Sequence, residues 1–78
     1  MESVPFRFNN DAKLRRQMET RGWTEAMIVE ALATAPLKTE GKHGAALRYV
    51  HPTTGQSLVV DEKTGEIFHL GKRGYRYD

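Results

Sequence analysis

Arg48, His69 and Arg76 each stand between two apolar or aromatic residues in the second half of the chain. Successive side chains of a strand point to opposite faces of a sheet, so inward packing of these neighbours sends the three polar side chains to the other face. A guanidinium group binds two phosphate oxygens at once, and an imidazole moves protons near neutral pH. The pattern therefore predicts a sheet face suited to a phosphate ester. An ordinary solvated face has the same alternation, and the pattern leaves both interpretations open.

Further cations gather at the two ends of the chain, although the net charge is only +2. Residues 1–22 carry five cations and three acids, residues 23–37 carry two acids and no cation, and residues 67–78 carry three cations and one acid. Clustered Lys and Arg favour a polyanionic partner, because each neutralised phosphate releases counterions. Tyr75 and Tyr77 in the basic tail offer rings on which an unstacked base could lie. A solubilising tail with two core tyrosines would have the same composition.

Two helices are predicted to position the first group of cations. Asn9-Asn10-Asp11 offers N-cap oxygens and a first-turn acid, and Gly22 suits the left-handed position that ends a helix. Thr24 is a good N-cap for a second helix, and Pro36 stops that helix because proline disfavours helix in the residue before it. Trp23, between the two helices, is predicted to be a core residue rather than a platform for a base.

Three strands are predicted in the second half, at residues 46–51, 57–61 and 66–70, separated by turns that contain glycine. Residues 75–77 could add an edge strand, and residues 38–44 read as a loop. Runs of helix followed by runs of strand indicate an α+β fold. We therefore expect two N-terminal helices packed on one face of a three- to four-stranded antiparallel sheet, in a single domain that spans residues 1–78.

The composition excludes several classes of protein. The chain has 78 residues and no cysteine, so it has room for one small core and has neither disulfides nor thiolate metal sites. Its three histidines are scattered without an acid partner at metal-ligand spacing, and we predict no metal site and no cofactor. No apolar run approaches the roughly 20 residues that a membrane helix needs. Residues 1–5 lack the basic and apolar regions of a signal peptide.

A succession of motifs resembles one family of bacterial toxins. The motifs are, in order, Arg7-Phe8-Asn9, Gly22-Trp23-Thr24-Glu25, Pro36, Arg48-Tyr49-Val50, Leu58-Val59-Val60-Asp61, Lys63-Thr64-Gly65-Glu66-Ile67 and a short Gly-rich basic tail. This succession, from about Phe6 to Tyr77, is similar to the C-terminal ribonuclease domain of colicins of the E-five type, which cleave tRNA anticodons. It also resembles the toxin domains of contact-dependent inhibition and of other polymorphic bacterial toxins.

The resemblance implies a barnase–EndoU–colicin–RelE type of fold and metal-independent cleavage of tRNA, in the anticodon loop. In that chemistry the ribose 2′-OH attacks the adjacent phosphorus and leaves 2′,3′-cyclic phosphate and 5′-OH ends. The resemblance also implies action in the bacterial cytoplasm, delivery as the end of a larger secreted toxin, and a cognate immunity protein or antitoxin of acidic character. We expect the domain to be a monomer.

The strand faces and the resemblance together give a predicted site. The predicted catalytic residues are Arg48, His69, Arg76 and Lys13. The predicted RNA-binding residues are Arg7, Arg15, Lys42, Lys63, Lys72, Arg73 and Tyr75. Within the family, catalysis is understood to rest on Lys and Arg without an essential histidine, so His69 is either the proton-transfer group or a bystander.

Other interpretations of the sequence remain open. A domain of the same fold could bind RNA or an acidic protein without cutting, and the chain could be a structural part of a larger protein. A DNA-binding protein would usually show a helix-turn-helix pattern or a denser basic face. Growth arrest on expression separates a ribonuclease from a binding module.

Overall fold

Both helices begin at their predicted caps and the first ends at Gly22, but the second ends at Leu32, four residues before Pro36, the predicted stop. In the computed structural model, which describes residues 6–41 and 44–72, the short strand β1 (Arg7–Phe8) leads into α1 (Asp11–Arg21) and α2 (Glu25–Leu32). The side chains of Asn10 and Thr24 accept backbone N–H groups in the first turns of α1 and α2. Gly22 ends α1 with a φ of 73°, a left-handed conformation that glycine adopts without strain.

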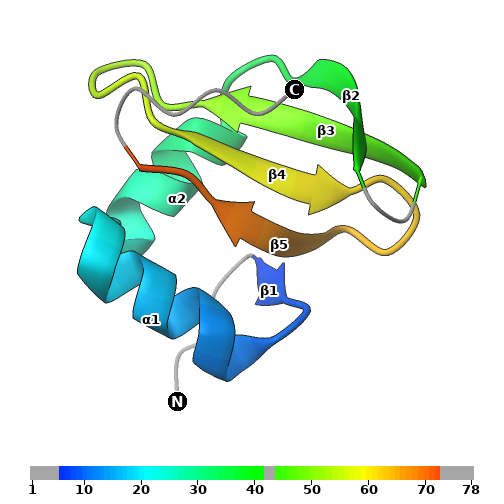
Figure 1. Ribbon diagram of the computed structural model, residues 1–78. Helices are drawn as coiled ribbons and strands as arrows, with labels where there is room; N and C mark the ends of the chain where they lie inside the picture. The colour runs from blue at the N-terminus through cyan, green and yellow to red at the C-terminus, as the bar shows by residue number, and fades with distance from the viewer. Residues whose placement is uncertain (1–5, 42–43, 73–78) are drawn as a thin grey trace.

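The sheet has five strands in the order β1-β5-β4-β3-β2 (Figure 1). The remaining strands are β2 (Leu37–Gly41), β3 (Gly44–Val50), β4 (Ser57–Asp61) and β5 (Glu66–Leu70). Neighbouring strands are antiparallel, except that β1 runs parallel to β5. The α+β class is confirmed, but a purely antiparallel sheet of three or four strands is wrong, because the sheet is mixed and has five.

Two strands escape the sequence pattern for different reasons. β2 overlaps residues 38–44, which read as a loop because of Gly41 and Gly44. Residues 37–41 are extended because they pair along their whole length with β3, so the partner strand and not local propensity decides their conformation. β1 has only two residues, too few for a periodic signal. The expected edge strand at residues 75–77 lies outside the described residues.

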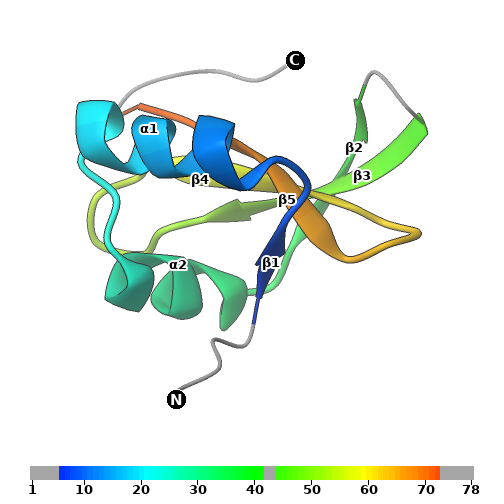
Figure 2. The same cartoon turned by 90° about the horizontal axis from the view of Figure 1, so that it is seen from below.

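The two helices do not share a face of the sheet. α2 contacts β3 and β4, whereas α1 contacts β5. Seen from below, α2 lies on one side of the strands, and α1 lies on the other side along the β5 edge (Figure 2). The prediction of both helices on one face is therefore wrong. β1 pairs only with Glu66 and Ile67, so the remainder of the β5 edge needs another cover, and α1 provides it.

Side chains of α1 satisfy the polar groups of that edge. The side-chain oxygen of Gln17 accepts the backbone N–H of Leu70 at 2.9 Å, and the guanidinium of Arg21 donates to the carbonyl of Leu70 at 2.6 Å. An unpaired N–H and C=O at a covered sheet edge would be costly. Gln17 and Arg21 thus fix α1 against the end of β5.

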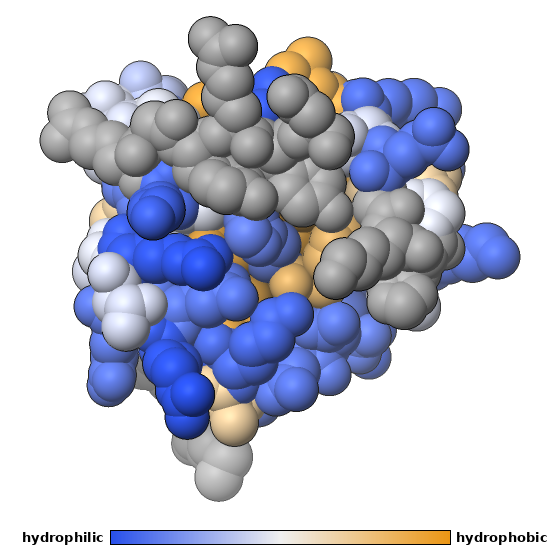
Figure 3. Space-filling model, in the orientation of Figure 1, coloured by the Kyte–Doolittle hydropathy of each residue, from blue (hydrophilic) through white to orange (hydrophobic). Residues whose placement is uncertain are grey.

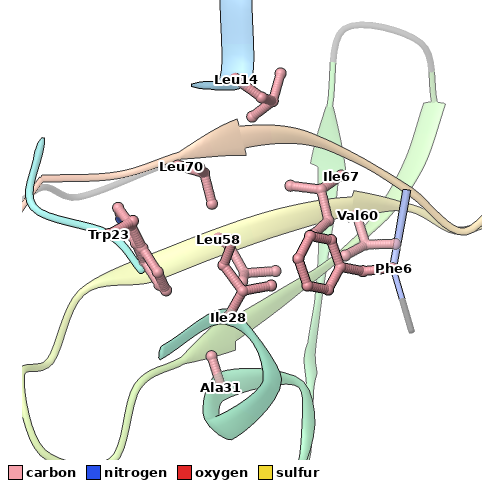
Figure 4. Packing of buried hydrophobic residues seen from close by; sticks show 9 residues of the cluster. All are labelled: Phe6, Leu14, Trp23, Ile28, Ala31, Leu58, Val60, Ile67 and Leu70. Carbon is pink, nitrogen blue, oxygen red and sulfur yellow. The ribbon is translucent and has the colours of Figure 1, made fainter. Parts of the chain in front are cut away.

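The core lies mainly between α2 and the sheet, and Leu14 of α1 reaches it (Figure 4). Its buried members come from every layer of the fold and are Phe6, Leu14, Trp23, Ile28, Ala31, Leu58, Val60, Ile67 and Leu70. Trp23 is 4% exposed and is a core residue, as predicted. No helix of the described residues has both the length and the apolar character to cross a membrane.

A bulge in β5 changes which of its side chains face the core. Val60 pairs with Ile67, whereas the preceding Val59 pairs with His69, so Phe68 is an extra residue in this strand. The prediction that Phe68 packs inward is wrong, because the insertion breaks the simple alternation. Phe68 is half-buried and lies outside the core cluster. The core side chains of β5 are Ile67 and Leu70.

The two hairpin turns are closed in the same way by different side chains. Asp61 Oδ1 accepts the N–H groups two and three residues later, and the Nδ1 atom of His51 does the same in its own turn. Since Nδ1 is an acceptor, the proton of His51 resides on Nε2, which donates to a carboxylate oxygen of Glu30 at 2.7 Å. His51 is buried and is thus held by its own turn on one side of the ring and by Glu30 of α2 on the other.

Replacing Trp23 with phenylalanine is expected to lower the free energy of unfolding by about 1–3 kcal/mol. The Nε1–H of Trp23 donates to the carbonyl of Gly71 at 2.7 Å in a buried setting. Phenylalanine keeps much of the ring packing but leaves this carbonyl without its donor. Urea denaturation of the two proteins measures the difference. An unchanged midpoint and slope would contradict the assigned bond.

Candidate functional site

Arg48 and His69 lie on the sheet face opposite α2, in one row of paired residues. Arg48 pairs with Val59 on β4, and Val59 pairs with His69 on β5. The residues that flank Val59 along β4 belong to the core, so the row points away from it. Two strand spacings separate the backbones of Arg48 and His69, roughly 10 Å. Leu37 of β2 pairs with Arg48 and extends the row to the sheet edge, where it is 52% exposed.

In the orientation of Figure 1, most of the surface that is not drawn in grey is hydrophilic, and a small hydrophobic strip lies within it (Figure 3). Val59 is fully buried, although it lies on the face away from the core cluster. Arg48 and His69 are half-buried beside it. The face therefore combines cationic and imidazole groups with an apolar floor.

α1 borders this face of the sheet along β5. Lys13, Gln17 and Arg21 are spaced four residues apart, so they lie on one side of the helix. Gln17 and Arg21 hold the backbone of Leu70, the residue that follows His69. The charges of both Lys13 and Arg21 act on His69. Lys13, one of the predicted catalytic residues, is therefore on the side of α1 whose charges act on His69. The open face is thus bordered by α1 and not free of both helices.

The environment of His69 makes its imidazole a neutral group at pH 7. Burial, and after it the positive charges of Arg21 and Lys13, together lower the pKa of His69 from 6.5 to about 4. A neutral imidazole surrounded by cations can accept a proton but holds it weakly. An anion bound between the imidazole and these cations would oppose the lowering of the pKa of His69 by Arg21 and by Lys13.

Acidification is expected to reduce stability through His69, by on the order of 1–2 kcal/mol. Above pH 6.5 the ring is neutral in the folded and unfolded chains, so it has no effect there. As the pH falls from 6.5 toward 4, the unfolded chain takes up the proton first, and the folded state loses stability. The effect is smaller than a fully buried ring would give, because water screens the half-buried group.

Denaturant unfolding of the wild type and of His69→Gln at several pH values measures this effect. The amide of glutamine does not titrate, so the variant should lose less stability than the wild type between pH 6.5 and 4. Carboxylates titrate equally in both proteins and cancel in the comparison. Parallel curves for the two proteins would contradict a lowered pKa at His69.

The predicted RNA-binding residues do not form one cluster. Arg7 donates to the carbonyl of Thr64 at 3.0 Å, which places it with Lys63 at the β4–β5 turn. Lys72 is exposed and follows the opposite end of β5. Arg15 is exposed on α1 and pairs with Asp11 at 2.9 Å. The other predicted site residues, Arg76, Lys42, Arg73 and Tyr75, lie outside the described residues.

Gln17 and Arg21 belong to the site and were absent from the predicted list. Their spacing from Lys13 is the signal that could have found them, because residues i, i+4 and i+8 line one side of a helix. The sequence does not show that this side of α1 meets β5, because it predicts both helices on the sheet face opposite to Arg48 and His69. The position of α1 at the sheet edge is what brings them to His69.

No group of three or more His, Cys, Asp or Glu side chains gathers in residues 6–41 and 44–72 in a way that could hold a metal ion. The charged groups beside His69 that the site offers to a ligand are the cations Lys13 and Arg21. Comparison of the chain with protein-family models, with curated proteins and with solved structures found no match.

Proposed function

We propose that this protein is a metal-independent endoribonuclease that cleaves tRNA, in the anticodon loop. The observation that carries the proposal is that one sheet face has an imidazole beside the cations of α1 and a further cation on β3. α1 brings Lys13 and Arg21 to His69 on β5, and β3 places Arg48 across Val59 on the same face. Cations around a neutral imidazole suit a phosphodiester, which needs charge stabilisation and proton transfer.

The proposed reaction uses the ribose 2′-OH as nucleophile. Its oxygen bonds to the adjacent phosphorus, and the bond from phosphorus to the 5′ oxygen breaks. His69 accepts the 2′ proton and, as imidazolium, passes it to the departing 5′ oxygen, so protons balance and the ring returns to its neutral form. Arg48, Lys13 and Arg21 stabilise the added negative charge on the phosphoryl oxygens. The products are a 2′,3′-cyclic phosphate and a 5′-OH.

The substrate and partners follow from the family resemblance. The motifs from Gly22-Trp23-Thr24-Glu25 to Lys63-Thr64-Gly65-Glu66-Ile67 are similar to the anticodon-cleaving colicin domain. We therefore propose tRNA as substrate, the bacterial cytoplasm as place of action, and an acidic immunity protein or antitoxin as inhibitor. A carboxylate-rich inhibitor would meet the cations of the site as the RNA backbone does.

Expression of the chain in bacteria without an inhibitor tests the proposal. Growth should stop within the induction period, and tRNA from the arrested cells should be cut in the anticodon loop. A chain that carries Arg48→Ala serves as control and should permit growth at the same protein level. Normal growth with intact tRNA at high levels of folded wild-type protein would refute the ribonuclease and favour a binding module.

A further inference from the structure

His69 is held in place by its neighbours on two elements. Its backbone pairs with Val59 of β4 at the bulge, and the next residue, Leu70, is fixed by Gln17 and Arg21 of α1. The ring is half-buried at the seam between α1 and β5. Strand, bulge and helix thus fix the backbone that carries the ring at this seam.

The charged groups that face the seam are mainly cationic. α1 contributes Lys13 and Arg21, and β3 contributes Arg48 beyond Val59. On β4, alternation places Asp61 on the same face, but its Oδ1 atom is already engaged by two backbone N–H groups of the turn. On β5, alternation also places Glu66 on this face, at the end of the strand next to the turn. Among the described residues of α1, β3, β4 and β5, this face thus has three cations and two carboxylates, and the charges that act on His69 are those of Arg21 and Lys13.

Such an arrangement couples the protonation of the ring to the binding of an anion. A phosphate group between Lys13 and Arg21 neutralises the charges that oppose protonation of the imidazole. It also supplies an acceptor oxygen for an N–H of the protonated ring. The coupling must be reciprocal, because a protonated ring adds one more positive charge for the phosphate to bind.

We infer that binding of an RNA phosphate at the α1–β5 seam is accompanied by uptake of a proton by His69 below pH 6. This inference rests on the proposed function, since it takes the same site to be the place where the phosphodiester binds. This coupling has a consequence for catalysis. The ring is weakly basic in the free protein, and bound substrate raises its pKa toward the working pH, where proton transfer is most effective.

NMR titration of the imidazole Cε1–H tests the inference. The probe is a single-stranded oligonucleotide that is entirely 2′-deoxy, which has the phosphates but lacks the nucleophile. In the free protein His69 should titrate with a pKa of about 4, and in the complex this pKa should move toward 6.5. If it reaches 6.5, calorimetry in buffers of different ionisation enthalpy should give an uptake of about 0.9 proton per complex at pH 5.5.

Two controls separate this effect from others. His69→Gln should bind the oligonucleotide with less than about tenfold loss, since glutamine also offers an N–H, and proton uptake should vanish. The Cε1–H resonance of His51 in the wild type should not shift when the oligonucleotide is added, because that ring is buried and is engaged by its own turn and by Glu30.

Two results would overturn the inference, and they have different meanings. An oligonucleotide that binds without changing the titration of His69 would remove the coupling but leave the ribonuclease proposal intact. An oligonucleotide that does not bind at low salt would remove the phosphate site as well. Cleavage of tRNA by the same preparation then decides whether the proposed function also fails.

Discussion

Arg48→Ala is expected to lower the rate of RNA cleavage by about 10²–10³-fold while the protein stays folded. Arg48 is on the face away from the core cluster and is half-buried beside Val59. Its guanidinium is proposed to stabilise the negative charge that grows on the phosphoryl oxygens, a contribution stronger in the transition state than in the bound substrate. The loss should therefore appear mainly in kcat, measured under single-turnover conditions with excess protein.

Lys38→Ala is the matched control for Arg48→Ala. Lys38 pairs with Leu47, so it lies on the sheet face toward α2, and its loss changes the net charge by the same amount. We expect Lys38→Ala to retain activity within about threefold. The small loss comes from the lower total charge, which weakens the long-range attraction of a polyanion. Equal losses in the two variants would mean that general positive charge and not the face of Arg48 supports cleavage. Full activity of Arg48→Ala would refute the assigned face.

Ile28→Ala is expected to destabilise the domain by about 2–5 kcal/mol and to lower its melting temperature by about 10 °C or more. Ile28 of α2 is fully buried in the core cluster, where its removal leaves a cavity. A domain of 78 residues has a total stability of about 4–12 kcal/mol, so this single loss is a large fraction of it. Thermal and urea unfolding followed by circular dichroism measure the change.

Val29→Ala controls for the same substitution on the next residue of α2. Val29 is also β-branched but is 42% exposed, so its removal leaves no cavity. Alanine has the higher helix propensity, and we expect a change within about 0.5 kcal/mol. If both variants lost several kcal/mol, the helix would be sensitive to any change, and the assigned core face of α2 would be wrong.

The local elements of the fold could be predicted because their signals are local. Asn10, Gly22 and Thr24 bound the helices through capping chemistry that depends on a few neighbouring residues. The strands at residues 57–61 and 66–70 match β4 and β5 because glycine-containing turns delimit them. The face of Arg48 follows from alternation in β3, which no bulge interrupts.

The features that could not be predicted depend on partners distant in the sequence. β2 is extended because β3 pairs with it, and nothing in Lys38-Thr39-Glu40 favours a strand strongly. The bulge at Phe68 is a property of two paired strands, so simple alternation assigns that side chain to the wrong face. α1 lies at the β5 edge because Leu70 has backbone groups to satisfy there, a requirement visible only in the assembled sheet.

The candidate site divides in the same manner. Lys13, Arg48 and His69 are predicted from the chemistry of their side chains. In the fold, the charge of Lys13 acts on His69, and Arg48 lies on the same sheet face as His69, across Val59. Arg21 was missed because its role depends on the position of α1. Arg15 was included for its charge, but it pairs with Asp11 on the helix surface. Charge alone does not distinguish these arginines, whereas helix spacing together with the position of the helix does.

The most direct test of the ribonuclease proposal is the chemistry of the ends that the purified protein produces. The protein is incubated with total tRNA in EDTA, and the fragments are examined for their terminal groups. We predict cleavage in the anticodon loop with 2′,3′-cyclic phosphate and 5′-OH ends, and none when the ribose at the cut is replaced by 2′-deoxyribose. Intact tRNA at high concentrations of folded protein, or 3′-OH and 5′-phosphate ends, would contradict the proposal.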